Sequence, residues 1–128
     1  MKKLTIDKGL LITDMEILFK GQTVLLKRVL VDTGSASTII SCDLAESIGI
    51  VAEENDPIYK VYGVGGSEFV YSKVVDSIKI GNMRVDNYQI EIGAMNYGFT
   101  LDGILGLDLL QQMKAMININ NLSLQWKC

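Results

Sequence analysis

Histidine is absent from the 128-residue chain, and cysteine occurs only twice. The missing histidine excludes a His-based catalytic triad, a His general base and a His-containing zinc site. Cys42 and Cys128 lie far apart and form no metal-binding spacing, and we interpret Cys42 as a buried or merely tolerated thiol rather than a reactive thiolate. We therefore expect neither a metal nor another cofactor. If the protein is an enzyme, carboxylates must carry its chemistry.

Charge and long apolar runs are also scarce. Charged residues make up 21% of the chain, and the formal net charge is -3. No basic patch is present to neutralise phosphates, so we expect no nucleic-acid partner. No apolar run reaches the ~18 residues that a membrane span needs, and Asp7, Lys8 and Asp14 interrupt any signal-peptide core near the start. These features predict a cytoplasmic protein without a membrane partner.

The single proline and the lack of a low-complexity linker favour one domain over residues 1–128. Short runs rich in Ile, Leu and Val, such as 10–20 and 23–31 with a glycine-containing turn between them, are typical of strands. Strands at this spacing predict a sandwich or a barrel. A change of alternation within 83–92 predicts a bulge near Asp86 and Asn87.

Only two short helices are expected. The first covers 43–48, where Asp43 and Glu46 have the spacing of a capping box and Gly49 provides a C-terminal stop. The second covers 107–114, and a hairpin at 115–127 closes the chain. The predicted fold class is therefore all-β with one or two short helices.

A carboxylate stands at the end of one predicted strand. Asp32 follows an apolar stretch at 29–31, and the chain continues through the small residues Thr33-Gly34-Ser35-Ala36. A charged oxygen at the edge of an apolar floor can have its pKa set by its surroundings. The run occurs once. Taken alone, it is compatible with a turn, a phosphate-binding loop or a catalytic acid.

Two further segments are weak signals when taken alone. The run Val61-Tyr62-Gly63-Val64-Gly65-Gly66-Ser67 lies between strand-like segments at 58–62 and 68–80. It fits either an ordinary flexible hairpin or a glycine-rich tip that approaches a ligand closely. The run Ile104-Leu105-Gly106 fits a buried strand that enters a helix.

Together, the three segments resemble the retropepsin-like aspartic proteases. The 32–36 run matches the catalytic loop, Gly63-Val64-Gly65-Gly66 matches the flap tip, and Ile104-Leu105-Gly106 matches the apolar-apolar-Gly segment. Their order and spacing also fit, so the resemblance covers nearly the whole chain. It implies a closed or partly closed β-barrel of the acid-protease type, with one glycine-rich flap hairpin.

The resemblance implies that the protein is an aspartic endopeptidase, a hydrolase of peptide bonds. In this family two carboxylates face each other across a two-fold axis, hold one water and share a proton, because like charges so close cannot both ionise. Only Asp32 carries the motif in this chain. The resemblance therefore implies a homodimer that acts on an extended peptide or protein substrate.

The resemblance also implies roles for the neighbouring residues. Thr33 would hydrogen-bond across the axis, Gly34 would let the backbone approach the carboxylate, and Ser35 would offer its hydroxyl to the outer carboxylate oxygen. Ile104, Leu105 and Gly106 would pack beneath the loop. The flap residues that would close over the substrate are Tyr62, Gly63, Val64, Gly65 and Gly66. Apolar side chains predicted to line the pockets are Val31, Val64 and Ile104.

Other acidic residues have simpler interpretations. We interpret Asp102 as a turn residue rather than a second catalytic acid, and Asp108 as a residue favoured by the dipole of a helix first turn. The acidic run at 53–56 is interpreted as a solvated loop rather than a metal site.

Two alternatives to an active protease remain. One is a catalytically weak retropepsin-like module that dimerises or binds peptides. The other is a phosphate-binding fragment, because Asp-x-Gly-Ser/Thr loops also occur in actin-like ATPases and sugar kinases. Those proteins need two larger α/β domains, which 128 mainly β residues cannot supply.

Overall fold

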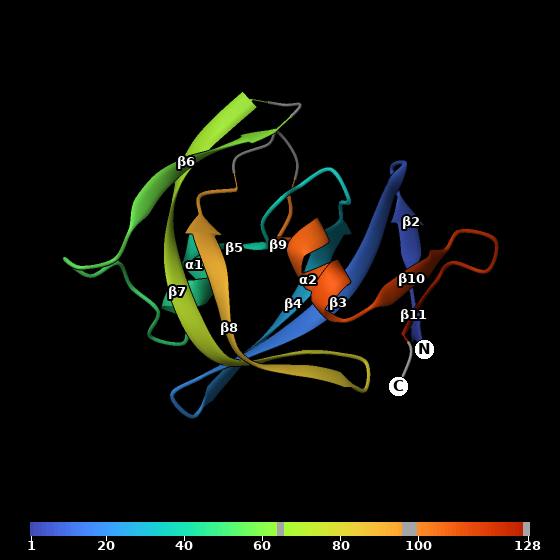
Figure 1. The fold of residues 1–128 in the computed structure, drawn as a ribbon, viewed down its shortest axis with the longest axis horizontal. Helices are drawn as coiled ribbons and strands as arrows, with labels where there is room; N and C mark the ends of the chain where they lie inside the picture. Colours follow the sequence, from blue (N-terminus) through green and yellow to red (C-terminus); the bar gives the residue numbers. More distant parts are fainter. Residues whose placement is uncertain (64–65, 96–99, 127–128) are drawn as a thin grey trace.

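The strands form two sheets in the computed structural model, which describes residues 1–63, 66–95 and 100–126 (Figure 1). The larger sheet has the order β2-β3-β4-β9-β5-β8-β7-β6, and the smaller one has the order β1-β11-β10. The strands of the larger sheet are β2 Thr5–Asp7, β3 Leu10–Phe19, β4 Gln22–Val31, β5 Ile39–Ser41, β6 Ile58–Gly63, β7 Gly66–Ile80, β8 Met83–Gly93 and β9 Gly103–Leu105. Those of the smaller sheet are β1 Lys2–Lys3, β10 Ala115–Asn118 and β11 Ser123–Trp126.

The larger sheet closes on itself. Strand β7 pairs with β3 through Glu16↔Lys79, Ile17↔Ile78 and Leu18↔Ser77, so that β3, β4, β9, β5, β8 and β7 form a hydrogen-bonded ring. Closure removes most free strand edges. The predicted all-β barrel is confirmed.

Two groups of buried apolar side chains lie on the two faces of this sheet. The main core includes the fully buried residues Met15, Ile17, Leu26, Ile40, Ile90, Ile92, Leu105 and Leu109. We call the other group the second cluster; it consists of Ile12, Ile39, Val70, Met95, Leu101 and Ile104, with Leu10, Leu30 and Val61 packed against it. The second cluster is the one that lies next to the candidate site, as described below.

The two helices are short and lie where they were predicted. They are α1 Cys42–Glu46 and α2 Leu107–Gln112. The expected capping box on α1 is wrong, because Ser41 is the N-cap residue and it makes no side-chain capping bond. Gly49, in the left-handed region at φ 84°, does follow the end of α1. Within the described residues, neither helix is long or apolar enough to cross a membrane.

The predicted bulge near Asp86 and Asn87 is also wrong, because β7 and β8 pair there without a register shift. The register of β7 with β8 is the same at Ser77↔Asp86 as at Val75↔Tyr88, so no extra residue is inserted. Asn87 instead adopts a left-handed conformation (φ 50°), and both strands change their buried face at the same level. The register shift that does occur lies between β3 and β4, at Thr13/Met15.

The closing hairpin at 115–127 is present as β10 and β11, and the chain start joins it. Lys2↔Leu124 and Lys3↔Ser123 pair β1 with β11, so this small sheet lies beside β2 at the right of Figure 1. The catalytic-loop candidate, in contrast, follows β4 at the top of the barrel.

Candidate active site

The Asp32 loop continues the barrel ladder by one residue. The Asp32 N–H donates to the Leu105 carbonyl (3.0 Å), which extends the parallel pairing of β4 with β9. The chain then turns, because the Ser35 N–H donates to the Asp32 carbonyl (3.2 Å). The Gly34 N–H donates to Oδ1 of Asp32 (2.9 Å). The half-buried carboxylate is thus held by its own turn.

The loop also rests on the segment that leads into α2. The Leu107 N–H donates to the Ser35 carbonyl (2.7 Å). Gly106 lies so close to the loop that a Cβ there would be 2.4 Å from the Ser37 carbonyl oxygen. The structure therefore brings Ile104, Leu105 and Gly106 next to the Asp32 loop, as the sequence predicted.

A partly buried polar network stabilises this contact from the side. The Thr38 hydroxyl donates to Oδ1 of Asp108 (2.8 Å), and the Tyr88 hydroxyl donates to Oδ2 of the same carboxylate (2.8 Å). The Gly106 N–H donates to Oγ1 of Thr38 (3.1 Å). Burial, followed by the bond to Asp108, raises the pKa of Tyr88. Asp108 therefore links α2 to β8 and to the residue that precedes β5, which the helix-dipole interpretation did not foresee.

Asp102 has a structural function. Its Oδ2 accepts hydrogen bonds from the N–H groups of Lys27 (3.1 Å) and Arg28 (2.9 Å), where β4 carries the register shift. Both donors are backbone groups that need an acceptor. The interpretation of Asp102 as a structural turn residue therefore agrees with its contacts.

Two contacts were predicted for the neighbours of Asp32. The one made by Ser35 differs in the structure, and the one made by Thr33 would require a second chain. The Ser35 hydroxyl donates to the Ser37 carbonyl (2.7 Å) rather than to the outer oxygen of Asp32, which corrects the predicted contact. A hydroxyl has one proton, and here it satisfies a nearby backbone acceptor of the same turn. The Thr33 side chain is exposed, so it is accessible to a second chain.

The β6–β7 hairpin stands above the barrel at the upper left of Figure 1. We call its residues 58–63 and 66–71 the flap. Gly63↔Gly66 is its last described pair, and Val64 and Gly65 lie outside the described residues. Val61 packs against the second cluster. Since side chains alternate along a strand, Tyr62 lies on the opposite face, where it is 78% exposed.

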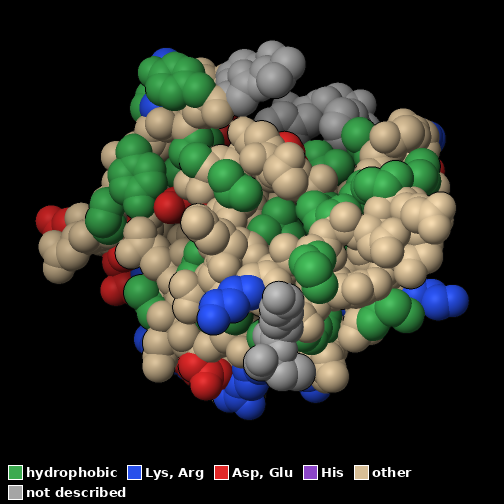
Figure 2. Space-filling model, turned by 45° about the vertical axis from the view of Figure 1, so that its right-hand side comes forward, with side chains coloured by type: hydrophobic (Ala, Val, Ile, Leu, Met, Phe, Trp, Pro, Cys, Tyr) green, Lys and Arg blue, Asp and Glu red, His purple; other side chains and the backbone are tan. Residues whose placement is uncertain are grey.

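The outer face of the flap is apolar with one cation. The Lys60 ammonium lies 5.9 Å from the ring centre of Tyr62 and 5.5 Å from that of Phe69. Hydrophobic side chains and basic atoms gather at the upper left of Figure 2, next to the grey atoms. Tyr62 therefore lies on the other face of the flap from Val61, and its contact with substrate stays a prediction.

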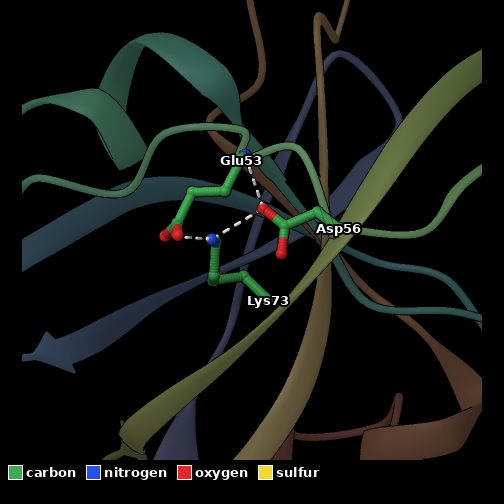
Figure 3. A network of polar contacts seen from close by, with 3 residues as sticks. All are labelled: Glu53, Asp56 and Lys73. Atoms are coloured by element: carbon green, nitrogen blue, oxygen red, sulfur yellow. Dashed lines mark hydrogen bonds and ion pairs between the residues drawn. The ribbon is translucent and has the colours of Figure 1, made fainter.

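The loop that leads into the flap is fastened by an ion pair (Figure 3). The Lys73 ammonium contacts Oδ2 of Asp56 (2.7 Å) and Oε1 of Glu53 (3.0 Å). The Glu53 N–H also donates to Asp56 (2.7 Å). The 53–56 run is therefore an anchoring loop on β7 and not only a solvated one.

This anchor is expected to release in acid. The hydrogen bond from Lys73, followed by that from the Glu53 N–H, lowers the pKa of Asp56 from its ordinary value of 3.8. Because the folded-state pKa is the lower one, the anchor is fully present above about pH 3.8 and is lost as the pH falls through the folded-state pKa. Amide chemical shifts of residues 51–57 should report this transition in an NMR titration. In Lys73→Met the midpoint of this transition should shift to higher pH, toward the ordinary pKa of an aspartate. An unchanged midpoint would contradict the role of Lys73 in the anchor.

The family model described as aspartyl protease matches residues 15–109. The chain belongs to the aspartyl protease family. The matched range of this aspartyl protease begins in β3 and ends in α2, so it contains the Asp32 loop, the flap and β9. The resemblance to retropepsin-like enzymes is thereby confirmed. A comparison with curated proteins gives no match.

Proposed function

We propose that this aspartyl protease is a homodimeric endopeptidase whose active site contains one Asp32 from each chain. The observation that carries the proposal is the state of the carboxylates around the loop. Asp102 is occupied by backbone amides and Asp108 by two hydroxyls, so each is committed to the structure. Asp32, in contrast, accepts from the Gly34 N–H of its own turn and lies beside an exposed Thr33. The second acid of the pair is then supplied by a second chain.

The chemistry follows from two such carboxylates sharing one proton. The ionised member accepts a proton from the water between them, while the protonated member donates a hydrogen bond to the scissile carbonyl. The water oxygen attacks the carbonyl carbon, and the proton it loses later reaches the leaving amine. The apparent pKa values belong to the pair and not to either residue.

The second cluster supports an extended, largely apolar substrate. Leu30 precedes Asp32 by two residues and so faces the same side of the strand. Leu30↔Ile104 and Ile39↔Ile104 pair across β4, β9 and β5, which places these side chains in one row below the carboxylate. Val61 of the flap packs on the same cluster. Val61 covers this row, so a peptide strand would enter as the flap lifts and would then contact apolar side chains on one side and flap backbone on the other.

Mixing active and inactive chains tests the stoichiometry. Wild type and Asp32→Asn are mixed in equal amounts and allowed to exchange subunits. About a quarter of the dimers then contain two intact chains, so the mixture should have about a quarter of the activity of wild type at the same total protein concentration. The same mixture assayed before exchange should retain about half. Activity that stays at half after exchange would show that one chain suffices.

Light scattering of the active fraction should give twice the chain mass of 14.1 kDa. A folded dimer that binds peptides without cleaving them would favour the peptide-binding module instead.

A further inference from the structure

A buried carboxylate lies at the root of the flap. Glu91 of β8 is only 7% exposed. The Ser72 hydroxyl of β7 donates to its Oε2 (2.7 Å), and the Tyr59 hydroxyl of β6 lies 3.4 Å from its Oε1. The Gln89 amide donates to the Tyr59 oxygen (3.3 Å) and to Oγ of Ser72 (3.2 Å), and the Tyr59 and Ser72 hydroxyls contact each other. We call these four side chains the root cluster.

The position of Glu91 in the sheet makes a carboxylate unexpected. Ile39↔Glu91 and Ser72↔Glu91 continue the cross-strand row that begins with Leu30 and Ile104. The members of this row on β4, β9 and β5 are apolar. A buried carboxylate costs free energy unless donors satisfy it, and an apolar residue is often the cheaper choice for stability. Packing alone therefore does not account for Glu91.

The root cluster connects β6 to β8, two strands that do not pair directly with each other in the sheet. Strand β6 is at the end of the sheet order and is followed only by β7, whereas Glu91 belongs to β8. The Tyr59 hydroxyl thus reaches across β7 and joins the outermost strand of the flap to the barrel wall.

The opposite face of β7 is fastened at the same level. Lys73 follows Ser72 and so points to the other side of the strand, where it holds Asp56 and Glu53. Side-chain bonds therefore fix β7 from both faces at 72–73, and the hairpin from Lys60↔Phe69 to Gly63↔Gly66 extends beyond this level.

We propose that Glu91 is a positioning residue, which through Tyr59 and Ser72 locks the root of the flap to the barrel and so sets the height at which the flap lies over a peptide. This inference rests on the proposed function. The Glu91 carboxylate accepts from both hydroxyls, while the Gln89 amide donates to both hydroxyl oxygens, so each donor has an acceptor. Replacing Tyr59 by Phe or Glu91 by Gln breaks this sequence of bonds with little change of volume.

Tyr59→Phe and Glu91→Gln are therefore tested against Tyr71→Phe. Tyr71 is also a flap tyrosine, but it lies on the opposite face of β7 from Ser72 and packs against the main core. In the two root variants, amide hydrogen exchange at residues 60–63 and 66–71 should become about tenfold faster, which corresponds to ~1.4 kcal/mol in the local opening equilibrium. The barrel strands β3 and β4 should exchange as in wild type, and Tyr71→Phe should not accelerate the flap.

Peptide cleavage supplies the second readout. A looser flap binds the peptide less well, so KM should rise about fivefold to tenfold in both root variants while kcat stays within about twofold. Equal exchange in root and control variants, or acceleration spread evenly over the barrel, would overturn the proposal. A kcat loss with unchanged KM would overturn it as well. If wild type cleaves no peptide, the proposed function fails, and the exchange measurement alone still decides whether the root is locked.

Discussion

Asp32→Asn should abolish peptide cleavage while leaving the fold unchanged. Asn has nearly the same shape as Asp, and its side-chain oxygen can still accept the bond that the Gly34 N–H donates at 2.9 Å. An amide, however, neither takes a proton from water nor shares one with a partner carboxylate. General acid–base catalysis contributes about 10²–10⁴-fold, so kcat/KM should fall by at least ~10²-fold. Cleavage of a mixed peptide library between about pH 4 and pH 7 measures this loss.

Asp102→Asn is the matched control. Both aspartates lie beside the β4–β9 pair, but the Asp102 side chain accepts from the backbone N–H groups of Lys27 and Arg28. Asn keeps one oxygen acceptor for these amides while it loses the charge, so the free energy of unfolding should drop by only about 1 kcal/mol. Activity should stay within about threefold of wild type. Cleavage that persists in Asp32→Asn but disappears in Asp102→Asn would show that the wrong carboxylate has been assigned.

The features that the sequence predicted well are local ones. Asp32 at a strand end, the turn after Phe19 and the stop at Gly49 each depend on residues a few positions apart. Alternation and turn chemistry describe such features directly. The three motifs are also local, and the barrel closure then places the Asp32 loop beside Gly106.

The features that the sequence missed depend on distant partners. The hydroxyls of Thr38 and Tyr88 meet Asp108 from 70 and 20 residues away, and no spacing rule connects them. Glu91 lies in the 83–92 run, whose change of alternation predicted only a bulge, and its burial beside Ser72 arises only when β7 and β8 pair. Strand β8 also contains Arg84, Asp86 and Gln89, so nothing in its sequence distinguished Glu91 from a solvent-exposed residue.

Asn87 shows a third kind of limit. The reversal of alternation around it was visible in the sequence, and a bulge is the usual cause. Here β7 and β8 reverse together and keep their register. The sequence of one strand cannot distinguish an inserted residue from a twist that both strands share.

Gly106→Ala should be the most destabilising of the substitutions considered. A Cβ at this position would lie 2.4 Å from the Ser37 oxygen, 2.6 Å from the Ser37 carbonyl carbon and 2.9 Å from the Ser35 oxygen. All three are backbone atoms, so no change of side-chain rotamer can make room. Overpacking of a buried site costs about 1–3 kcal/mol and sometimes more, and we expect about 3 kcal/mol by urea unfolding.

Gly21→Ala is the control that separates two requirements for glycine, a positive φ and a lack of space for a Cβ. Gly21 has φ 81° but open space around its Cβ position, so alanine there should cost about 1 kcal/mol through backbone strain. Gly106 has φ -86° and ψ 175°, an extended conformation that any residue adopts, so its requirement is for space alone. A cost at Gly106 no greater than that at Gly21 would contradict the close approach. If the loop shifts to make room for the Cβ, Asp32 moves with it. A misplacement of ~1 Å can lower a rate about 10²-fold, so activity should fall even if much of the free energy of unfolding is retained.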